Sequence, residues 1–127
     1  MSRHFFRAMK SDADRLPRIG QTARELGVRP DRDIPVDPQG HVSPMTGGMS
    51  ITADDPMNLP PHRRPVTYNG TGRDPVFTIE GDQVTTIHSL RQDGMHHFLV
   101  EPKYPCPFHD FQAAIHLTRP HWLILDS

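Results

Sequence analysis

The sequence predicts an α+β fold in one small domain, residues 1–127, with a mixed or antiparallel sheet, few short helices and long proline-rich loops. Three observations support this. The length of 127 residues fits a single domain. The 14 prolines exclude a helical bundle, a coiled coil and a long repeat array, because proline ends helices. Several short strand-like segments flank only two helical patterns, which is typical of the α+β class.

Residues 4–10 predict the first strand. Side chains alternate between the faces of a strand, so Phe5 and Arg7 would share one face, and Phe6 and Ala8 the other. An arginine between apolar residues either points to solvent or meets an anion, because an unpaired buried charge is costly.

Residues 20–27 predict a short helix, because apolar positions recur at helical spacing and Gly27 provides a stop. A long loop follows from 29 to 65, where eight of the 14 prolines lie. Such loops are uncommon unless they have a function. Within it, only residues 47–52 could form a strand or a helical turn.

The second half of the chain is more regular. Residues 74–79 predict a strand that the turn 80–82 closes. Residues 87–92 and 95–101 predict the two strands of a hairpin, because the dipeptide Asp-Gly between them is a strong turn signal.

The best helical pattern spans residues 107–119, where apolar residues recur every three or four positions. Pro107 suits a first helical turn and Pro120 ends the pattern. Residues 122–125 predict a short strand or a packed tail.

Composition narrows the function classes. The net charge of −1 argues against generic nucleic-acid binding. The single cysteine, Cys106, excludes an internal disulfide framework and a cysteine zinc site. No apolar run approaches the roughly 20 residues of a membrane span, and the N-terminus is not a classical secretory signal. We therefore expect synthesis in the cytoplasm, with export left to a dedicated secretion system.

Two segments carry hydroxyl and basic groups. Gly47 and Gly48 would let the backbone approach a ligand, and Ser50 and Thr52 would face one side of a strand, which suits a ribose or an amide. An edge strand with ordinary surface hydroxyls fits the same pattern. The basic run 62–64 could clamp phosphates or be solvated.

The second predicted hairpin strand carries His97 and Glu101 on one face. An imidazole and a carboxylate on one face can position a hydroxyl or transfer a proton. No HxH or HxxxH spacing occurs among the nine histidines, so the sequence predicts no metal site.

Four motifs in this order resemble a family of small cytotoxic effectors of bacterial type VI secretion, which have an ADP-ribosyltransferase-like fold. The motifs are Phe6-Arg7-Ala8, Thr46-Gly47-Gly48-Met49-Ser50-Ile51, Leu90-Arg91-Gln92-Asp93 and His97-Phe98-Leu99-Val100-x-Pro102.

The resemblance implies a split sheet with NAD in a cleft between its halves. It implies that Arg7 orients the dinucleotide and that Ser50 supports the nicotinamide ribose, with Gly48, Met49 and His97 completing the cofactor site.

The resemblance also implies a catalytic set. Gln92 or Glu101 would stand where the family places the group that accepts a hydrogen bond from the ribose 2′-hydroxyl, and Ser50 would assist. The implied partners are NAD and a cognate neutralising protein. Two alternatives remain open: a non-enzymatic interaction module that docks through the segment 56–65, and a histidine-based metal enzyme.

Overall fold

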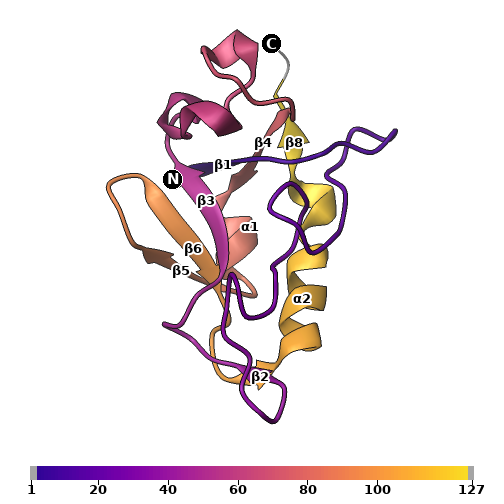
Figure 1. The fold of residues 1–127 in the computed structure, drawn as a ribbon, viewed down its shortest axis with the longest axis vertical. Coiled ribbons are helices and arrows are strands. Elements are labelled where there is room, and N and C mark those ends of the chain that lie inside the picture. Colours follow the sequence, from indigo (N-terminus) through magenta and orange to yellow (C-terminus); the bar gives the residue numbers. More distant parts are fainter. Residues whose placement is uncertain (1–2, 126–127) are drawn as a thin grey trace.

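The computed structural model describes residues 3–125, and its main feature is a six-stranded antiparallel sheet (Figure 1). The strands lie in the order β5-β6-β3-β1-β4-β8, and each neighbouring pair is antiparallel. The predicted α+β class is therefore confirmed, and the sheet is antiparallel rather than mixed within the described residues. The strand bounds are β1 His4–Ala8, β3 Met49–Ala53, β4 Val76–Glu80, β5 Ser89–Gln92, β6 His97–Glu101 and β8 Leu123–Ile124.

The other elements are short. The bounds are β2 His41–Val42 and β7 Cys106–Pro107, which pair with each other, the helices α1 Gly81–Thr85 and α2 Phe108–His116, and the 3-10 turns η1 Pro56–Asn58, η2 Pro61–Arg63, η3 Val66–Tyr68 and η4 Arg119–His121. Within residues 3–125, no helix combines the length and the apolar character needed to cross a bilayer.

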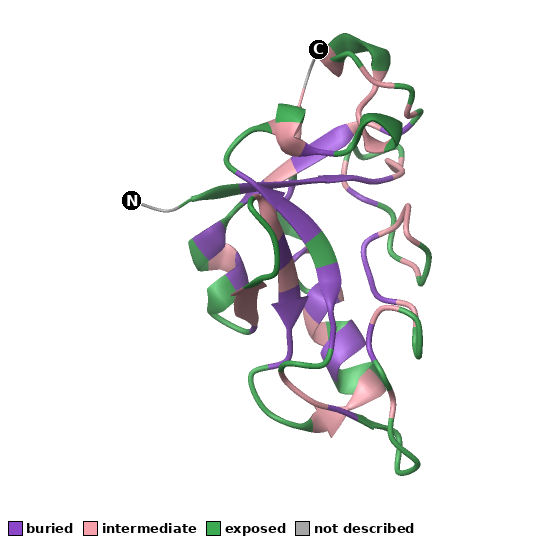
Figure 2. Cartoon of the chain, turned by 60° about the vertical axis from the view of Figure 1, so that its left-hand side comes forward, coloured by how far each residue is buried: buried purple, intermediate pink, exposed green. Residues whose placement is uncertain are grey.

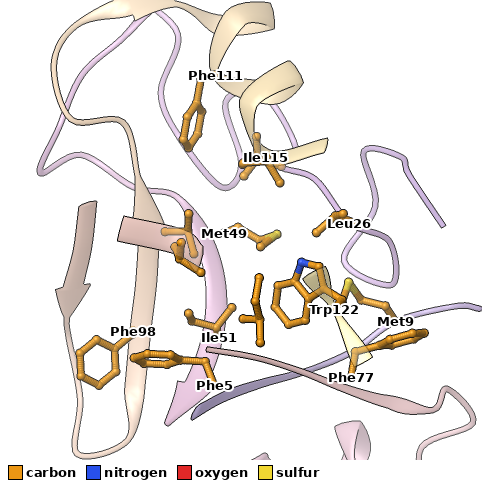
Figure 3. Close-up of a cluster of buried hydrophobic side chains, with 14 of the residues drawn as sticks. Phe5, Met9, Leu26, Met49, Ile51, Phe77, Phe98, Phe111, Ile115 and Trp122 are labelled. Atoms are coloured by element: carbon orange, nitrogen blue, oxygen red, sulfur yellow. The ribbon is translucent and has the colours of Figure 1, made fainter. Parts of the chain in front are cut away.

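The main core lies between the sheet and α2. Phe111 and Ile115 of α2 point toward Met49 of β3, and Trp122 lies at the centre of the cluster (Figure 3). All four side chains are almost fully buried. Full burial of one large apolar side chain stabilises a fold by about 1.5–3 kcal/mol. The apolar positions that predict the helix 107–119 are thus the ones that pack against the sheet, although α2 itself spans only residues 108–116.

Residues 56–68, which contain the turns η1, η2 and η3, are called the proline-rich segment below. This segment contributes to a second cluster on the opposite face of the sheet. Phe6 and Val76 point away from α2, and Leu59 from the end of η1 packs against them. Tyr68 of η3 and Leu125 lie at the edge of this cluster. The sheet therefore has a helix on one face and the 3-10 segment on the other.

The sheet opens between β1 and β3. These strands pair at only two positions, Phe5 with Ala53 and Phe6 with Thr52, whereas β1 and β4 pair at five. Beyond the short ladder the two strands diverge, and both are largely buried where they cross (Figures 1 and 2). The opening places the end of β1 beside a space that no backbone ladder fills.

The predicted helix 20–27 is wrong. The segment is an irregular loop, with a bridge between Ile19 and Leu26. The carbonyl of Arg24 accepts a hydrogen bond from the Lys10 amide at 2.7 Å, and the carbonyls on either side of it accept from arginine side chains. In a helix over 20–27 the Ala23 carbonyl would accept from the Gly27 amide, whereas here it accepts from two arginine side chains. Long-range contacts therefore decide the backbone here.

The second half follows the predictions more closely. Residues 87–92 and 95–101 do form a hairpin, as β5 and β6, and the turn closes with a 3.0 Å hydrogen bond from the Asp93 amide to the His97 carbonyl. The predicted strand 74–79 is β4, but α1 begins at Gly81 in place of the predicted turn. Residues 123–124 form the edge strand β8 against β4.

The long loop 29–65 is largely ordered. It contains β2, β3, η1 and η2, so the segment predicted as a strand or a helical turn is a strand. The first strand, predicted over 4–10, ends at Ala8.

Candidate functional site

A cavity of about 200 Å³ lies on the sheet face opposite α2, where residues 59–63 pass over β1, β3 and β6. Its floor and walls are apolar at Phe6, Ala8, Leu59 and Pro60. Its polar lining residues are Arg7, Ser50, Thr52, His62, Arg63 and His97. No carboxylate from residues 3–125 is among the lining side chains. The cavity thus combines cationic groups and hydroxyls without a balancing anion.

Two hydroxyl groups enter the cavity from β3. Ser50 and Thr52 are two residues apart on one strand, so both side chains lie on the same face. Ser50 is exposed, whereas Thr52 is 6% exposed. The hydroxyl pair that the sequence predicted is present and lines a cavity.

Arg7 enters the site from the opening in the sheet. It is only 7% exposed, and its guanidinium spans the gap between β1 and β3 by donating from Nη1 to the Ser50 carbonyl at 2.9 Å. Nη2 donates to the carbonyls of Ala23 at 3.3 Å and Glu25 at 2.9 Å. Nε is buried and has no hydrogen-bond partner among the described residues. Arg7 is therefore a buried cation held by backbone dipoles.

Arg63 approaches the same place from the proline-rich segment. Pro60 and Pro61 begin the 3-10 turn η2, which ends at Arg63. The fixed φ of proline suits the start of such a turn. The Nη2 of Arg63 donates to the Ala23 carbonyl at 2.7 Å, the oxygen that Arg7 also uses. Two guanidinium groups from residues 56 positions apart thus meet on one carbonyl oxygen.

The electrostatic environment of Arg7 reflects this crowding. Burial is the largest cause that lowers the pKa of Arg7 to about 10; the positive charges of Arg63 and Arg29 contribute in the same direction, and the negative charge of Asp33 opposes them. Asp33 is itself paired with Arg29, at 2.9 Å between Nη2 and Oδ1. Arg7 remains protonated at neutral pH, so the cavity keeps its positive charge.

His97 lies at the opposite wall, at the start of β6. Its Nδ1 is hydrogen-bonded to a carboxylate oxygen of Asp93, four residues earlier across the hairpin turn. An ionised carboxylate accepts, so Nδ1 donates and Nε2 remains for another group. The side chain is 43% exposed. A carboxylate that orients an imidazole in this way is a common arrangement for proton transfer.

The two residues predicted to stabilise the transition state are held outside the cavity. The amide of Gln92 donates from Nε2 to the carbonyls of Gly94 and Met95, so it braces the hairpin turn. Glu101 is 1% exposed and accepts from Arg91 Nε at 2.9 Å. Neither side chain lines the cavity that Ser50 and His97 line.

Gly48 and Met49 also lie outside the cavity lining. A Cβ on Gly48 would lie 2.1 Å from the Val100 carbonyl oxygen, so the glycine permits close contact between β3 and β6. The Met49 side chain is 2% exposed and packs in the main core. Of the predicted cofactor-binding residues, the structure brings together Arg7, Ser50 and His97.

Two residues that the sequence did not assign to the site belong to it. His62 and Arg63 line the cavity, and the basic run 62–64 was the available signal. Thr52, whose hydroxyl shares a strand face with that of Ser50, is also a lining residue. The sequence cannot show that a turn near position 63 reaches a strand that begins at position 4.

The structure provides no support for the histidine-based metal alternative. Within residues 3–125, no three His, Cys, Asp or Glu side chains come close enough together to hold a metal ion. His88, the most buried histidine, is 1% exposed and packs edge-on against Phe111 in the core.

Comparison of the chain with protein-family models, with curated proteins and with solved structures finds no match.

Proposed function

We propose that this chain is an NAD-using ADP-ribosyltransferase-like effector, which transfers ADP-ribose to a macromolecule or cleaves NAD to nicotinamide and ADP-ribose. The observation that carries the proposal is the cavity at the opening of the sheet. It gathers Arg7, Ser50 and His97, three of the residues that the sequence resemblance associates with NAD, from strands that are far apart in the chain.

The chemistry of the lining suits a dinucleotide. The guanidinium groups of Arg7 and Arg63 match phosphate oxygens, and the hydroxyls of Ser50 and Thr52 match the hydroxyls of a ribose. The volume of about 200 Å³ is below the roughly 300–1,000 Å³ of ordinary ligand pockets. The cavity therefore accommodates one part of the dinucleotide, and the remainder lies across its open rim.

The proposal assigns proton transfer to His97. In the reaction, an oxygen of the acceptor or of water forms a bond to the ribose carbon as the bond from that carbon to nicotinamide breaks. Nicotinamide leaves with the electron pair, and the proton of the attacking oxygen passes to Nε2 of His97. Asp93 holds the ring through Nδ1 and stabilises the protonated imidazole that results.

The proposed activity is tested by measuring nicotinamide release from NAD. We expect turnover by the wild-type chain and a loss of about 100-fold or more in His97→Ala, since a positioned general base contributes about that much. His96→Ala is the matched control, because His96 is the neighbouring histidine and does not line the cavity. The absence of both turnover and NAD-induced thermal stabilisation in the wild type would contradict the proposal.

A second candidate is a non-enzymatic interaction module that docks through the proline-rich segment. The observation that favours it is the exposure of apolar side chains on the 3-10 turns, with Val66 79% exposed and Met57 40% exposed. A tight protein partner whose binding is lost in Val66→Asp but kept in His97→Ala would favour this reading.

A further inference from the structure

The imidazole of His97 lies between two strands that each place a polar side chain beside it. In the sheet, β6 lies between β5 and β3. The β5–β6 register, continued by one position, places Asp93 opposite His97, and the β3–β6 register places Thr52 opposite His97 on the other side. Directly paired residues share a face of the sheet, with Cβ atoms about 4.5–5.5 Å apart. A carboxylate, an imidazole and a hydroxyl therefore form one row across the sheet.

The orientation of the His97 ring follows from its hydrogen bond to Asp93. Nδ1 donates to that carboxylate, which lies on the β5 side of the ring. The two nitrogens lie on different edges of an imidazole, so Nε2 faces the β3 side, where Thr52 lies. Both Thr52 and His97 line the cavity, and the Thr52 hydroxyl has no hydrogen-bond partner among residues 3–125. An unpaired hydroxyl thus lies beside the free nitrogen of an oriented base.

We propose that Thr52 is a nucleophile that His97 and Asp93 activate, and that this row gives the chain a second activity, the hydrolysis of small carboxylic esters. A hydroxyl, a base within its reach and a third group that orients the base form the constellation of nucleophilic catalysis on unrelated folds. The hydrogen bond between nucleophile and base commonly tightens only when substrate binds. The activity goes beyond the proposed function, because it requires no NAD.

The register favours Thr52 over the other hydroxyl of the cavity. Ser50 pairs with Leu99, so it is a diagonal neighbour of His97, and such neighbours lie about 7–8 Å apart. Thr52 is 6% exposed, and because it lines the cavity, an ester reaches it from there. The cavity of about 200 Å³ accommodates the acyl part of a small ester, and the alcohol part lies at the open rim.

Arg63 supplies the positive charge that an ester hydrolase needs beside its nucleophile. It lines the same cavity. Its one side-chain hydrogen bond within residues 3–125 uses Nη2, which leaves Nε and Nη1 as donors for a ligand oxygen. Donors near the position where negative charge develops stabilise the transition state of acyl transfer.

The reaction proceeds in two balanced steps. Oγ1 of Thr52 forms a bond to the carbonyl carbon as its proton passes to Nε2 of His97, and the bond from that carbon to the alcohol oxygen then breaks. The leaving alkoxide takes the proton from Nε2. Water next attacks the acyl group and gives a proton to Nε2, which returns it to Oγ1 as the carboxylic acid leaves.

A fluorophosphonate probe tests the nucleophile without NAD. The hydroxyl oxygen bonds to phosphorus as fluoride leaves, and the hydroxyl proton passes to His97. We expect the wild-type chain to gain one phosphonyl group, which peptide mapping by mass spectrometry places on Thr52. Hydrolysis of p-nitrophenyl acetate is the second measurement, and we expect both reactions to be about 100-fold slower in His97→Ala. His96→Ala, at the histidine outside the cavity lining, should match the wild type in both.

Variants of Thr52 separate the nucleophile from the fold. We expect Thr52→Val, which keeps the shape and removes the hydroxyl, to lose labelling and ester hydrolysis. Thr52→Ser should keep labelling at position 52, and it serves as the second variant in case Thr52→Val does not fold. Thr67→Val makes the same change at an exposed threonine outside the cavity and should react as the wild type does.

Three results would overturn the proposal: no reaction of the folded wild type with the probe, labelling on Ser50 in place of Thr52, or equal rates in His97→Ala and His96→Ala. The two activities can fail separately. Ester hydrolysis that depends on Thr52, in a chain that leaves NAD intact, supports this site and rejects the proposed function. Release of nicotinamide by a chain that reacts with neither probe nor ester supports the proposed function and rejects this site.

Discussion

Arg7 connects three segments of the chain through its side chain. Its guanidinium bonds the carbonyl of Ser50 on β3 and the carbonyls of Ala23 and Glu25 in the irregular loop. Removal of the side chain would take these donors away, although the Ala23 carbonyl would keep the one from Arg63, and each buried group left unpaired costs about 1–3 kcal/mol. Arg7→Ala therefore changes folding and binding together.

His88 is a buried histidine whose charge state couples stability to pH. Burial lowers its pKa to about 4 from 6.5, so the folded chain holds the neutral ring where the unfolded chain binds a proton. Stability should be full above pH 6.5 and fall as the pH drops toward 4. At pH 5 the loss from this residue is about 2 kcal/mol. Burial also lowers the pKa of His116, which acts in the same direction.

The measurement for His88 is urea unfolding at pH 7.5 and pH 5. We expect His88→Leu to lose less stability than the wild type between these values, because the variant has no ring to protonate at that position. His109→Leu, on the exposed side of α2, should keep the wild-type dependence. An equal loss in His88→Leu and the wild type would rule out this role.

At the level of elements, the side chain of Gln112 joins α2 to the loop at Val28 through the two hydrogen bonds that a neighbouring strand would make. The Gln112 amide oxygen accepts from the Val28 amide at 2.9 Å, and its nitrogen donates to the Val28 carbonyl at 3.0 Å. Val28 and Gln112 are both buried. Val28 is not part of a strand, so its buried N–H and C=O groups form their hydrogen bonds with a side chain of α2 instead.

Gln112→Leu should lower the free energy of unfolding by about 3 kcal/mol, because it leaves a buried N–H and a buried C=O unpaired. Chemical denaturation at neutral pH measures the difference. Gln21→Leu makes the same substitution at an exposed glutamine of the irregular loop, and should change stability by no more than about 0.5 kcal/mol. Equal effects of the two substitutions would show that the Gln112 contacts do not stabilise the fold.

At the level of the whole molecule, a nearly neutral chain concentrates cations at one place. The net charge is −1, yet the cavity lining has two arginines and two histidines and no carboxylate from residues 3–125. A small anion is attracted to such a site, whereas the net charge of −1 gives no general attraction for an extended polyanion. The sheet makes this arrangement possible because α2 packs against one face and the proline-rich segment packs against the other.

Production of the chain in the cytoplasm of a susceptible bacterium should slow growth, because the proposed activity consumes NAD or modifies a cellular target. Growth curves after induction measure the effect. We expect His97→Ala to restore growth and His96→Ala not to, at equal protein levels. A cognate neutralising protein, once found, should restore growth with the wild-type chain. Normal growth with well-expressed wild type would contradict the effector role.

Local patterns in the sequence predict most of the regular elements. Side-chain alternation over 4–10 corresponds to β1, and alternation over 95–101 corresponds to β6. The Asp-Gly dipeptide forms the hairpin turn, and the apolar periodicity over 107–119 corresponds to α2. Each depends on neighbours within a few residues, because side-chain direction in a strand or a helix follows from local geometry. The hydroxyl pair at Ser50 and Thr52 was predictable for the same reason.

The sequence by itself therefore determined the α+β class, the hairpin and three members of the candidate site, since each follows from local periodicity or a short motif. Only the tertiary structure decided that residues 20–27 form a loop, that Glu101 is buried against Arg91, and that Arg63 meets Arg7. These outcomes depend on contacts between segments that lie many residues apart, such as the 40 positions between Ala23 and Arg63. The competition for backbone carbonyls is settled there by packing, which no local pattern encodes.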